Sequence, residues 1–205
     1  MATLDSIRRD FLFTAGIARA LWRIVPLARN RTRVLPDEIE RLAARYGERV
    51  ALLYDSETLT YAGLNARANR YARWAMANGI GKGDTVCLMM PNRPEFVAIW
   101  LGVALAGGVT ALINTNLTGQ ALAYCINIVK PKHIIVAHEL EAAFATVTSL
   151  FDASIRVWTH GGGEGRRADE AVTLFDDGPI PRAERPALTH EDRCLYIYTS
   201  GTTGM

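Results

Sequence analysis

The sequence predicts an α/β fold, with a mostly parallel sheet flanked by helices. Helix-like and strand-like segments alternate from Pro36 onward. Several strand-like segments, such as Thr85–Met90, are continuous apolar runs, as expected where both faces of a sheet are covered. The chain has 205 residues, 49% of them hydrophobic, which is enough for an ample core.

Composition excludes several classes of protein. The formal net charge is only +2, from 23 basic and 21 acidic side chains, so the chain is neither a disordered polymer nor a nucleic-acid binder driven by bulk charge. The three cysteines (Cys87, Cys125 and Cys194) form no CxxC pair, and the four histidines show no ligand spacing. We therefore predict no metal-ligating residues and no nucleic-acid partner.

Residues 1–35 are predicted to form a basic amphipathic helix. They hold seven arginines and two aspartates, a net charge of +5. Apolar residues recur there at steps of three and four: Leu4, Ile7, Phe11, Ala15, Ala18, Trp22 and Val25. Such a helix can lie in a membrane interface with anionic lipid, or it can cover its own domain. Both interpretations stay open at this point.

The segment after Pro36 begins with a helix, a pair of strands and a longer helix. We predict a helix over Glu38–Tyr46, then two short strands over Val50–Tyr54 and Thr58–Tyr61. The hydroxyl of Thr60 is suited to cap the next helix, Tyr61–Ala77, because it can accept a free backbone N–H of the first turn.

An uncharged stretch of 18 residues, 96–113, is near the lower limit for a membrane span. The pair Gly107-Gly108 interrupts it. A buried helix from about Pro94 to Ala106, a glycine stop and a buried strand over Val109–Ile113 explain it better. The remaining predicted elements are helices over Gly119–Val129 and Glu139–Leu150, and strands over His133–Ala137, Ile155–Thr159 and Leu195–Tyr198.

The last predicted strand runs directly into a hexamer of glycines and hydroxyl residues. The hexamer is Thr199, Ser200, Gly201, Thr202, Thr203 and Gly204. Its glycines let the backbone approach a ligand closely, and consecutive backbone N–H groups in such a turn form a concave anion site. Its four hydroxyls add donors for phosphate oxygens. The hexamer therefore predicts a phosphate-binding loop without the Walker pattern, the alternative being a hydrophilic hairpin turn.

The string YTSGTTG, residues 198–204, closely resembles the ATP-binding loop of the adenylate-forming (acyl-CoA synthetase) superfamily. Three earlier segments are also similar to that superfamily: Thr58–Asn69, Gly79–Val86 and Met90–Phe96. Two further segments, Ala111–Leu117 and Tyr196–Tyr198, resemble the long- and very-long-chain acyl-CoA synthetase group, which includes the fatty-acid transport proteins.

This resemblance implies a fatty acid–CoA ligase. Such enzymes use ATP to convert a carboxylate to an acyl-adenylate and pyrophosphate, and then form a thioester with CoA. The implied cofactors and partners are ATP, Mg²⁺, CoA and a long-chain fatty acid. The implied fold is part of the large N-terminal domain of these enzymes, with the hexamer holding the phosphates of ATP. We expect a cytoplasmic protein, with residues 1–35 as a candidate for peripheral contact with the inner face of the cell membrane.

The sequence departs from the family pattern at Met205, where the pattern continues into Pro-Lys. We therefore expect residues 36–205 to be a partial AMP-binding domain, truncated inside the phosphate loop. No catalytic residue is expected within it, and we expect the chain to be inactive alone.

Three alternatives to this interpretation remain. The first is another acyl, aryl or aminoacyl adenylating enzyme. The segment Ile113–Leu117 favours a long-chain acyl substrate over this alternative. The second is a membrane-associated component of fatty-acid uptake, and the third is a non-functional remnant.

Overall fold

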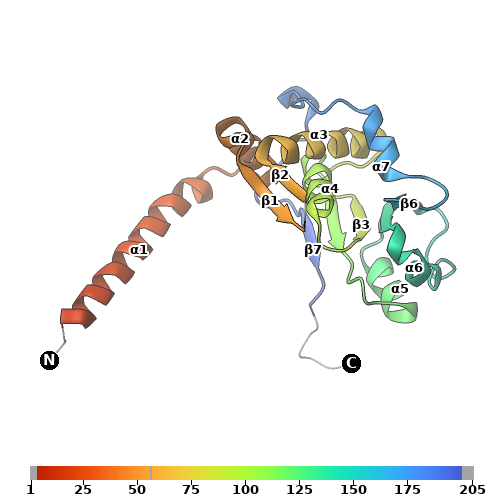
Figure 1. The fold of residues 1–205 in the computed structure, drawn as a ribbon, viewed down its shortest axis with the longest axis horizontal. Coiled ribbons are helices and arrows are strands. Elements are labelled where there is room, and N and C mark those ends of the chain that lie inside the picture. The colour runs from red at the N-terminus through yellow and green to blue at the C-terminus, as the bar shows by residue number, and fades with distance from the viewer. Residues whose placement is uncertain (1–3, 56, 200–205) are drawn as a thin grey trace.

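A five-stranded parallel sheet forms the centre of the chain in the computed structural model, which describes residues 4–55 and 57–199 (Figure 1). The strand order is β6-β5-β3-β4-β7. The bounds are Thr85–Met89 for β3, Val109–Leu112 for β4, His133–Ala137 for β5, Arg156–His160 for β6 and Leu195–Ile197 for β7. In the register, Cys87 of β3 lies opposite Ala111 of β4 and Ile134 of β5. The predicted parallel sheet is confirmed.

Helices cover both faces of this sheet. Val86 and Leu88 belong to one core cluster, with α3 (Tyr61–Ala77) and α4 (Pro94–Leu105). Cys87 and Met89 belong to the other, with α5 (Gly119–Ile128) and α6 (Glu141–Ala145). Because successive side chains of a strand point to opposite faces, one fully buried strand supplies both cores.

The segment that leads into the sheet also follows the predictions closely. After α2 (Leu35–Tyr46), the strands β1 (Val50–Tyr54) and β2 (Glu57–Thr60) pair antiparallel. The Thr60 hydroxyl accepts a hydrogen bond of 3.1 Å from the backbone N–H of Gly63, so the predicted cap of α3 is confirmed.

Helices α3 and α4 cross at a glycine. A Cβ atom on Gly102 would lie 2.4 Å from Cβ of Tyr71 and 2.7 Å from the carbonyl oxygen of Ala68. Only glycine allows the two backbones to approach this closely. The bulky side chains of Tyr71 and Trp74 then pack fully buried in the same cluster.

The predicted helix over Glu139–Leu150 is wrong in its length. A 3₁₀ turn (His138–Leu140) precedes α6, which ends at Ala145. The hydroxyls of Thr146 and Thr148 donate to the carbonyl oxygens of Ala143 and Ala145. Such local hydrogen bonds compete with the helical ones and weaken the helix.

A proline-containing segment, residues 176–186, runs across the outer side of α3. The guanidinium of Arg73 donates to the carbonyl oxygens of Asp176 and Gly178, and the Asn69 amide donates to that of Asp177. The short helices before and within this segment are α7 (Ala168–Ala171) and the 3₁₀ turns Val172–Leu174 and Arg182–Glu184.

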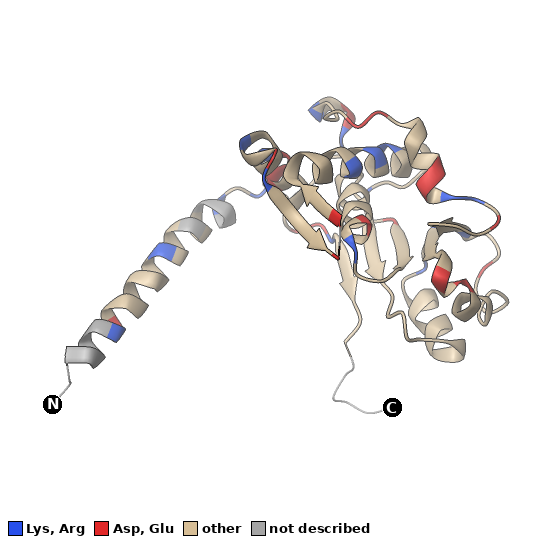
Figure 2. Cartoon of the chain, viewed as in Figure 1, with Lys and Arg blue, Asp and Glu red and all other residues tan. Residues whose placement is uncertain are grey.

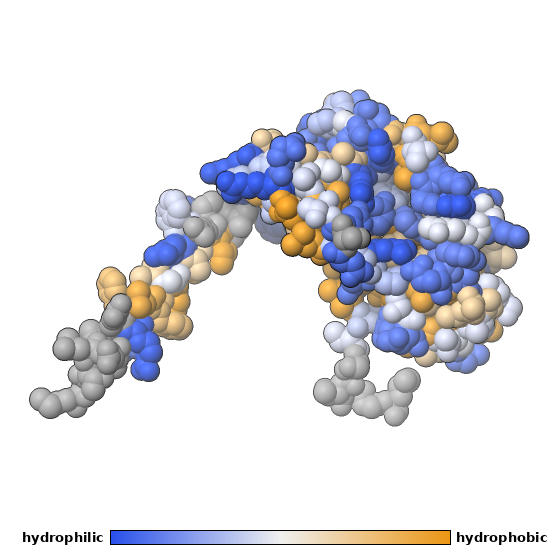
Figure 3. All heavy atoms as spheres, viewed as in Figure 1, coloured by the Kyte–Doolittle hydropathy of each residue, from blue (hydrophilic) through white to orange (hydrophobic). Residues whose placement is uncertain are grey.

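Helix α1 (Leu4–Arg29) extends away from the sheet and its covering helices (Figure 1). Phe11 is 71% exposed and Trp22 is 78% exposed, so the apolar side of the helix does not cover the rest of the described chain. Basic and apolar residues share its surface (Figures 2 and 3). Within the described residues, no helix is both long enough and apolar enough to cross a membrane.

Candidate functional site

The carboxyl ends of β3, β4 and β7 meet at one edge of the sheet. Ligands of open parallel sheets bind outside this edge, because the loops there are free to vary while the strands hold them in place. Tyr198 and Thr199 follow β7 at this edge, and Thr199 is exposed. The other predicted phosphate-binding residues lie outside the described residues: Ser200, Gly201, Thr202, Thr203 and Gly204.

A cavity of about 350 Å³ opens beside Tyr198. Its lining comes from the last residue of β4 and from the segments that follow the three strands: Met90, Pro91, Asn92, Phe96, Leu112, Ile113, Asn114, Thr115 and Tyr198. The lining therefore combines apolar side chains with two amides and two hydroxyls. Such a surface can bind a largely apolar group and orient it through a few hydrogen bonds.

The segment after β4 is held in a defined turn beside this cavity. The side-chain oxygen of Asn114 accepts a hydrogen bond of 2.9 Å from the backbone N–H of Asn116. The backbone N–H of Ile113 donates to the carbonyl oxygen of Leu88, at 2.9 Å, which ties the turn to β3. An asparagine at such a turn replaces a backbone hydrogen bond and fixes the path of the chain.

Tyr198 connects the stem of the predicted loop to α5. Its hydroxyl donates a hydrogen bond of 2.7 Å to the carbonyl oxygen of Cys125. Burial raises the pKa of the Tyr198 phenol, and the neighbouring thiols of Cys87 and Cys125 act in the same direction. The phenol is therefore neutral, and remains a donor, throughout the physiological pH range.

A half-buried carboxylate, that of Glu95, lies in the first turn of α4, close to the cavity. Glu95 accepts hydrogen bonds from the Tyr71 hydroxyl, at 2.7 Å, and from the Arg67 guanidinium, at 2.8 Å. Burial alone would raise its pKa, but the interactions with His160, Tyr71 and Arg67 outweigh it and lower the pKa of Glu95 to about 2. A carboxylate held this firmly in its ionised form is suited to structure rather than to proton transfer.

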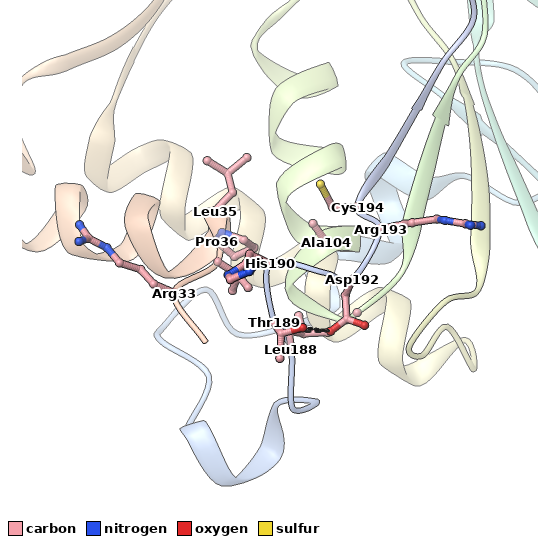
Figure 4. A pocket seen from close by; sticks show the side chains of 12 residues that line it. Arg33, Leu35, Pro36, Ala104, Leu188, Thr189, His190, Asp192, Arg193 and Cys194 are labelled. Carbon is pink, nitrogen blue, oxygen red and sulfur yellow. Dashed lines mark hydrogen bonds between the residues drawn. The ribbon is translucent and has the colours of Figure 1, made fainter. Parts of the chain in front are cut away.

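A second pocket, of about 210 Å³, lies at the opposite edge of the sheet (Figure 4). Its lining includes Arg33, Leu188, His190 and Cys194, close to the amino ends of β4 and β7. The backbone N–H of His190 donates to the carbonyl oxygen of Arg31, at 2.9 Å, so the pocket follows a seam between two chain segments. Its position separates it from the predicted phosphate-binding residues.

Sequence reasoning did not assign Asn92, Asn114 and Thr115 to the site. Their segments, Met90–Phe96 and Ala111–Leu117, show the family resemblance, but no residue type in them indicates contact with a ligand. The available signal was that each follows a predicted strand, which places it at the same edge as the loop. Among the described residues there is no cluster of three potential metal ligands.

The sequence model of one family, described as AMP-binding enzyme, matches residues 39–205. The chain belongs to the AMP-binding enzyme family. The predicted resemblance to the adenylate-forming superfamily is thereby confirmed.

Curated proteins resemble the chain over most of its length. Long-chain fatty acid transport protein 1 of Rattus norvegicus is 36% identical over 209 residues, covering 97% of this chain and 32% of that protein. The medium/long-chain-fatty-acid–CoA ligase FadD6 of Mycobacterium tuberculosis is 34% identical over 169 residues, covering 79% of this chain and 26% of that protein. The chain thus spans a third or less of these relatives.

Solved structures of two CoA ligases share the fold of the chain. The anthranilate CoA ligase AuaEII superposes with a TM-score of 0.75 at 22% identity, over 82% of this chain and 32% of that one. A benzoate CoA ligase from Burkholderia xenovorans LB400 gives 0.69 at 20% identity, over 80% of this chain and 32% of that one. The predicted fold class is confirmed by these likenesses.

Proposed function

We propose that the chain supplies the N-terminal part of an ATP-dependent fatty acid–CoA ligase. The observation that carries this proposal is the string YTSGTTG in a member of the AMP-binding enzyme family, with its first residue, Tyr198, directly after the carboxyl end of β7. Residues 36–205 would form the corresponding part of the AMP-binding domain.

The proposed reaction has two steps. A carboxylate oxygen of the fatty acid attacks the α-phosphorus of ATP, the bond to the bridging oxygen breaks, and pyrophosphate leaves. The CoA thiol, having lost its proton, then attacks the carbonyl carbon of the acyl-adenylate, and AMP leaves with the electrons of the broken acyl–oxygen bond.

The role that we assign to this chain is to hold the leaving phosphates. The hydroxyls of Thr199, Ser200, Thr202 and Thr203 would donate to phosphate oxygens, while Gly201 and Gly204 let the backbone N–H groups approach them. Positioning and charge stabilisation supply much of the rate enhancement at a phosphorus centre. Mg²⁺ would neutralise phosphate charge when bound with ATP. That ion commonly keeps several waters and binds through the phosphate oxygens of the nucleotide.

The proposed acyl substrate is a long-chain fatty acid. Two observations support it: the names of the relatives with 34–36% identity, and the segment Ile113–Leu117, which resembles the long-chain group. Each additional methylene buried in an apolar site contributes about 0.8 kcal/mol. Affinity should therefore increase with chain length until the acyl site is filled.

Exchange of labelled pyrophosphate into ATP tests the proposal. The longest natural protein that contains this sequence should show exchange that depends on long-chain fatty acids. The double variant Ser200→Ala/Thr202→Val should lose most of it, and the 205-residue chain alone should show none. Exchange that depends only on aryl acids or amino acids would favour another adenylating enzyme, and no exchange with any acid would contradict the proposal.

We further propose that α1 makes peripheral contact with the anionic inner face of the cell membrane. The observations in favour are the exposure of Phe11 and Trp22 and the net charge of +5 in residues 1–35. Apolar side chains inserted at the interface and arginines near anionic headgroups would act together. Co-sedimentation with phosphatidylserine-containing vesicles should weaken in high salt and on deletion of residues 1–35. Unchanged binding after deletion would contradict this role.

A further inference from the structure

We propose that Tyr198 is a positioning residue for nucleotide binding, through the hydrogen bond of its hydroxyl to the end of α5. This inference rests on the proposed function, because it assumes that residues 199–204 bind the phosphates of ATP. It goes further by assigning a role to a side chain outside that hexamer.

The backbone pairing of β7 ends one residue before Tyr198. The register joins Leu195 to Thr110, Tyr196 to Ala111 and Ile197 to Leu112, and it continues no further. Strand β7 is paired with β4 alone and is only three residues long. Tyr198 follows β7 directly, and its hydroxyl adds a side-chain hydrogen bond to α5 just before the hexamer.

The acceptor of this hydrogen bond is a carbonyl that its own helix leaves without a partner. Helix α5 ends at Ile128, so Cys125 lies in its last turn. The last four carbonyls of a helix have no N–H donor further along the same helix. The Tyr198 hydroxyl, at 2.7 Å, supplies that donor and links α5 to the stem of the loop.

The Tyr198 ring is held by the core as well as by its hydroxyl. It packs half-buried against the cluster that contains Cys87 and Met89, on the α5 side of the sheet, and it also lines the 350 Å³ cavity. Ile197, next to it, is 68% exposed. A side chain fixed at both its ring and its hydroxyl transmits the position of the sheet to the residue that follows it.

Tyr196 provides a matched control. It is also half-buried and packs against the same cluster. Its hydroxyl accepts a hydrogen bond of 3.2 Å from Arg193, which belongs to the same segment, rather than donating one to the end of α5 as the Tyr198 hydroxyl does. Removing the Tyr196 hydroxyl therefore leaves the link between α5 and the loop intact.

The experiment compares Tyr198→Phe with Tyr196→Phe in the longest natural protein that contains this sequence. Steady-state pyrophosphate exchange gives kcat and the KM values for ATP and for the fatty acid. The loss of one hydrogen bond should raise the KM for ATP about three- to tenfold in Tyr198→Phe, with kcat and the fatty-acid KM within about twofold of the wild type. Tyr196→Phe should leave all three near their wild-type values.

The outcomes separate this inference from the proposed function. If the wild-type protein shows no exchange, the proposed function fails. If the wild type is active and the two variants have the same KM for ATP, the role of Tyr198 is refuted.

A second measurement covers the case in which Tyr198→Phe does not fold. 3-Fluorotyrosine at position 198 keeps the donor hydroxyl, and its ¹⁹F resonance should move on addition of ATP. The same label at position 196 should move less. Equal shifts at the two positions would overturn the inference.

Discussion

The indole N–H of Trp158 donates a hydrogen bond of 3.0 Å to Nδ1 of His133. Since an indole can only donate, Nδ1 must be the acceptor, and the ring proton lies on Nε2, which faces the carbonyl oxygen of Asn78 at 3.1 Å. Trp74 stacks edge-on against Trp158, with ring centroids 5.1 Å apart. His133 is thus built into the core as a neutral imidazole.

Acidification should therefore destabilise the fold through His133. Burial lowers the pKa of this imidazole from its ordinary value of 6.5, so the unfolded chain binds the proton more readily than the folded chain. The contribution to stability is complete above about pH 6.5 and is lost as the pH falls through the lowered pKa. Urea unfolding between pH 8 and pH 5 should show the loss, and His133→Gln should have a flatter profile. An equally steep profile in His133→Gln would contradict this account, and His138→Gln serves as the surface control.

Glu95 should impose a second pH dependence at lower pH. Its pKa is lowered from 4.5 to about 2, so the carboxylate contributes stability that is complete above about pH 4.5 and is lost as the pH falls toward 2. This difference in pKa between the folded and the unfolded chain corresponds to at most about 3 kcal/mol of the free energy of unfolding. Glu95→Gln should lower the free energy of unfolding at pH 7 and reduce its slope between pH 4.5 and 2. If Glu164→Gln, at an exposed loop position, reduces the slope as much, the assignment to Glu95 is wrong.

Gly102→Ala should be strongly destabilising. The added methyl would meet Tyr71 and Ala68 where α3 and α4 cross, and overpacking of this kind costs about 1–3 kcal/mol. Gly16→Ala is the matched change on an exposed helix, since a Cβ there meets nothing within 4 Å. Gly16→Ala should instead stabilise the helical state of α1 by about 0.5–1 kcal/mol, because alanine has a higher helix propensity than glycine. Thermal unfolding and far-ultraviolet circular dichroism of both variants test this, and equal melting temperatures would refute the crossing argument.

Arg185 should matter more to stability than its neighbour Arg182. The Arg185 side chain is 7% exposed and donates to Glu40, at 2.8 and 2.9 Å, and to the carbonyl oxygen of Ile180, at 2.7 Å. The Arg182 side chain is 56% exposed and pairs with Asp37 at the surface. Arg185→Ala should cost about 3 kcal/mol, because it leaves partly buried partners unpaired, and Arg182→Ala less than about 1 kcal/mol. Chemical denaturation provides the comparison, and similar losses would show that the segment 176–186 is not held through Arg185.

The sequence predicted most of the fold because its signals were local. Helix α3 and strands β1 and β5 have the predicted bounds, since each is delimited by a cap or a turn and has one clear periodicity. Helix α2 begins three residues earlier than predicted, because Pro36 can occupy the first turn of a helix. The strand order could not be predicted: β5 adds beside β3 rather than beside β4, and only long-range packing decides between these positions.

The candidate site was only partly predictable, for a related reason. A motif such as YTSGTTG can be recognised within one segment, but the cavity beside it combines residues that follow three strands. The hydrogen bond from Tyr198 to Cys125 joins residues 73 positions apart, and nothing in either local sequence indicates it. The binding of ATP phosphates by residues 199–204 stays a prediction.

Among the described strands of the parallel sheet, β7 pairs with β4 alone and comes last in sequence order. During synthesis, the other four strands leave the ribosome first and can assemble without it, because each pairs with one of the others. We therefore expect β7 to pair with β4 only after β3, β4, β5 and β6 have assembled. Pulse-labelled hydrogen exchange during refolding should then protect residues 133–137 before residues 195–197, and the reverse order would contradict this sequence of events.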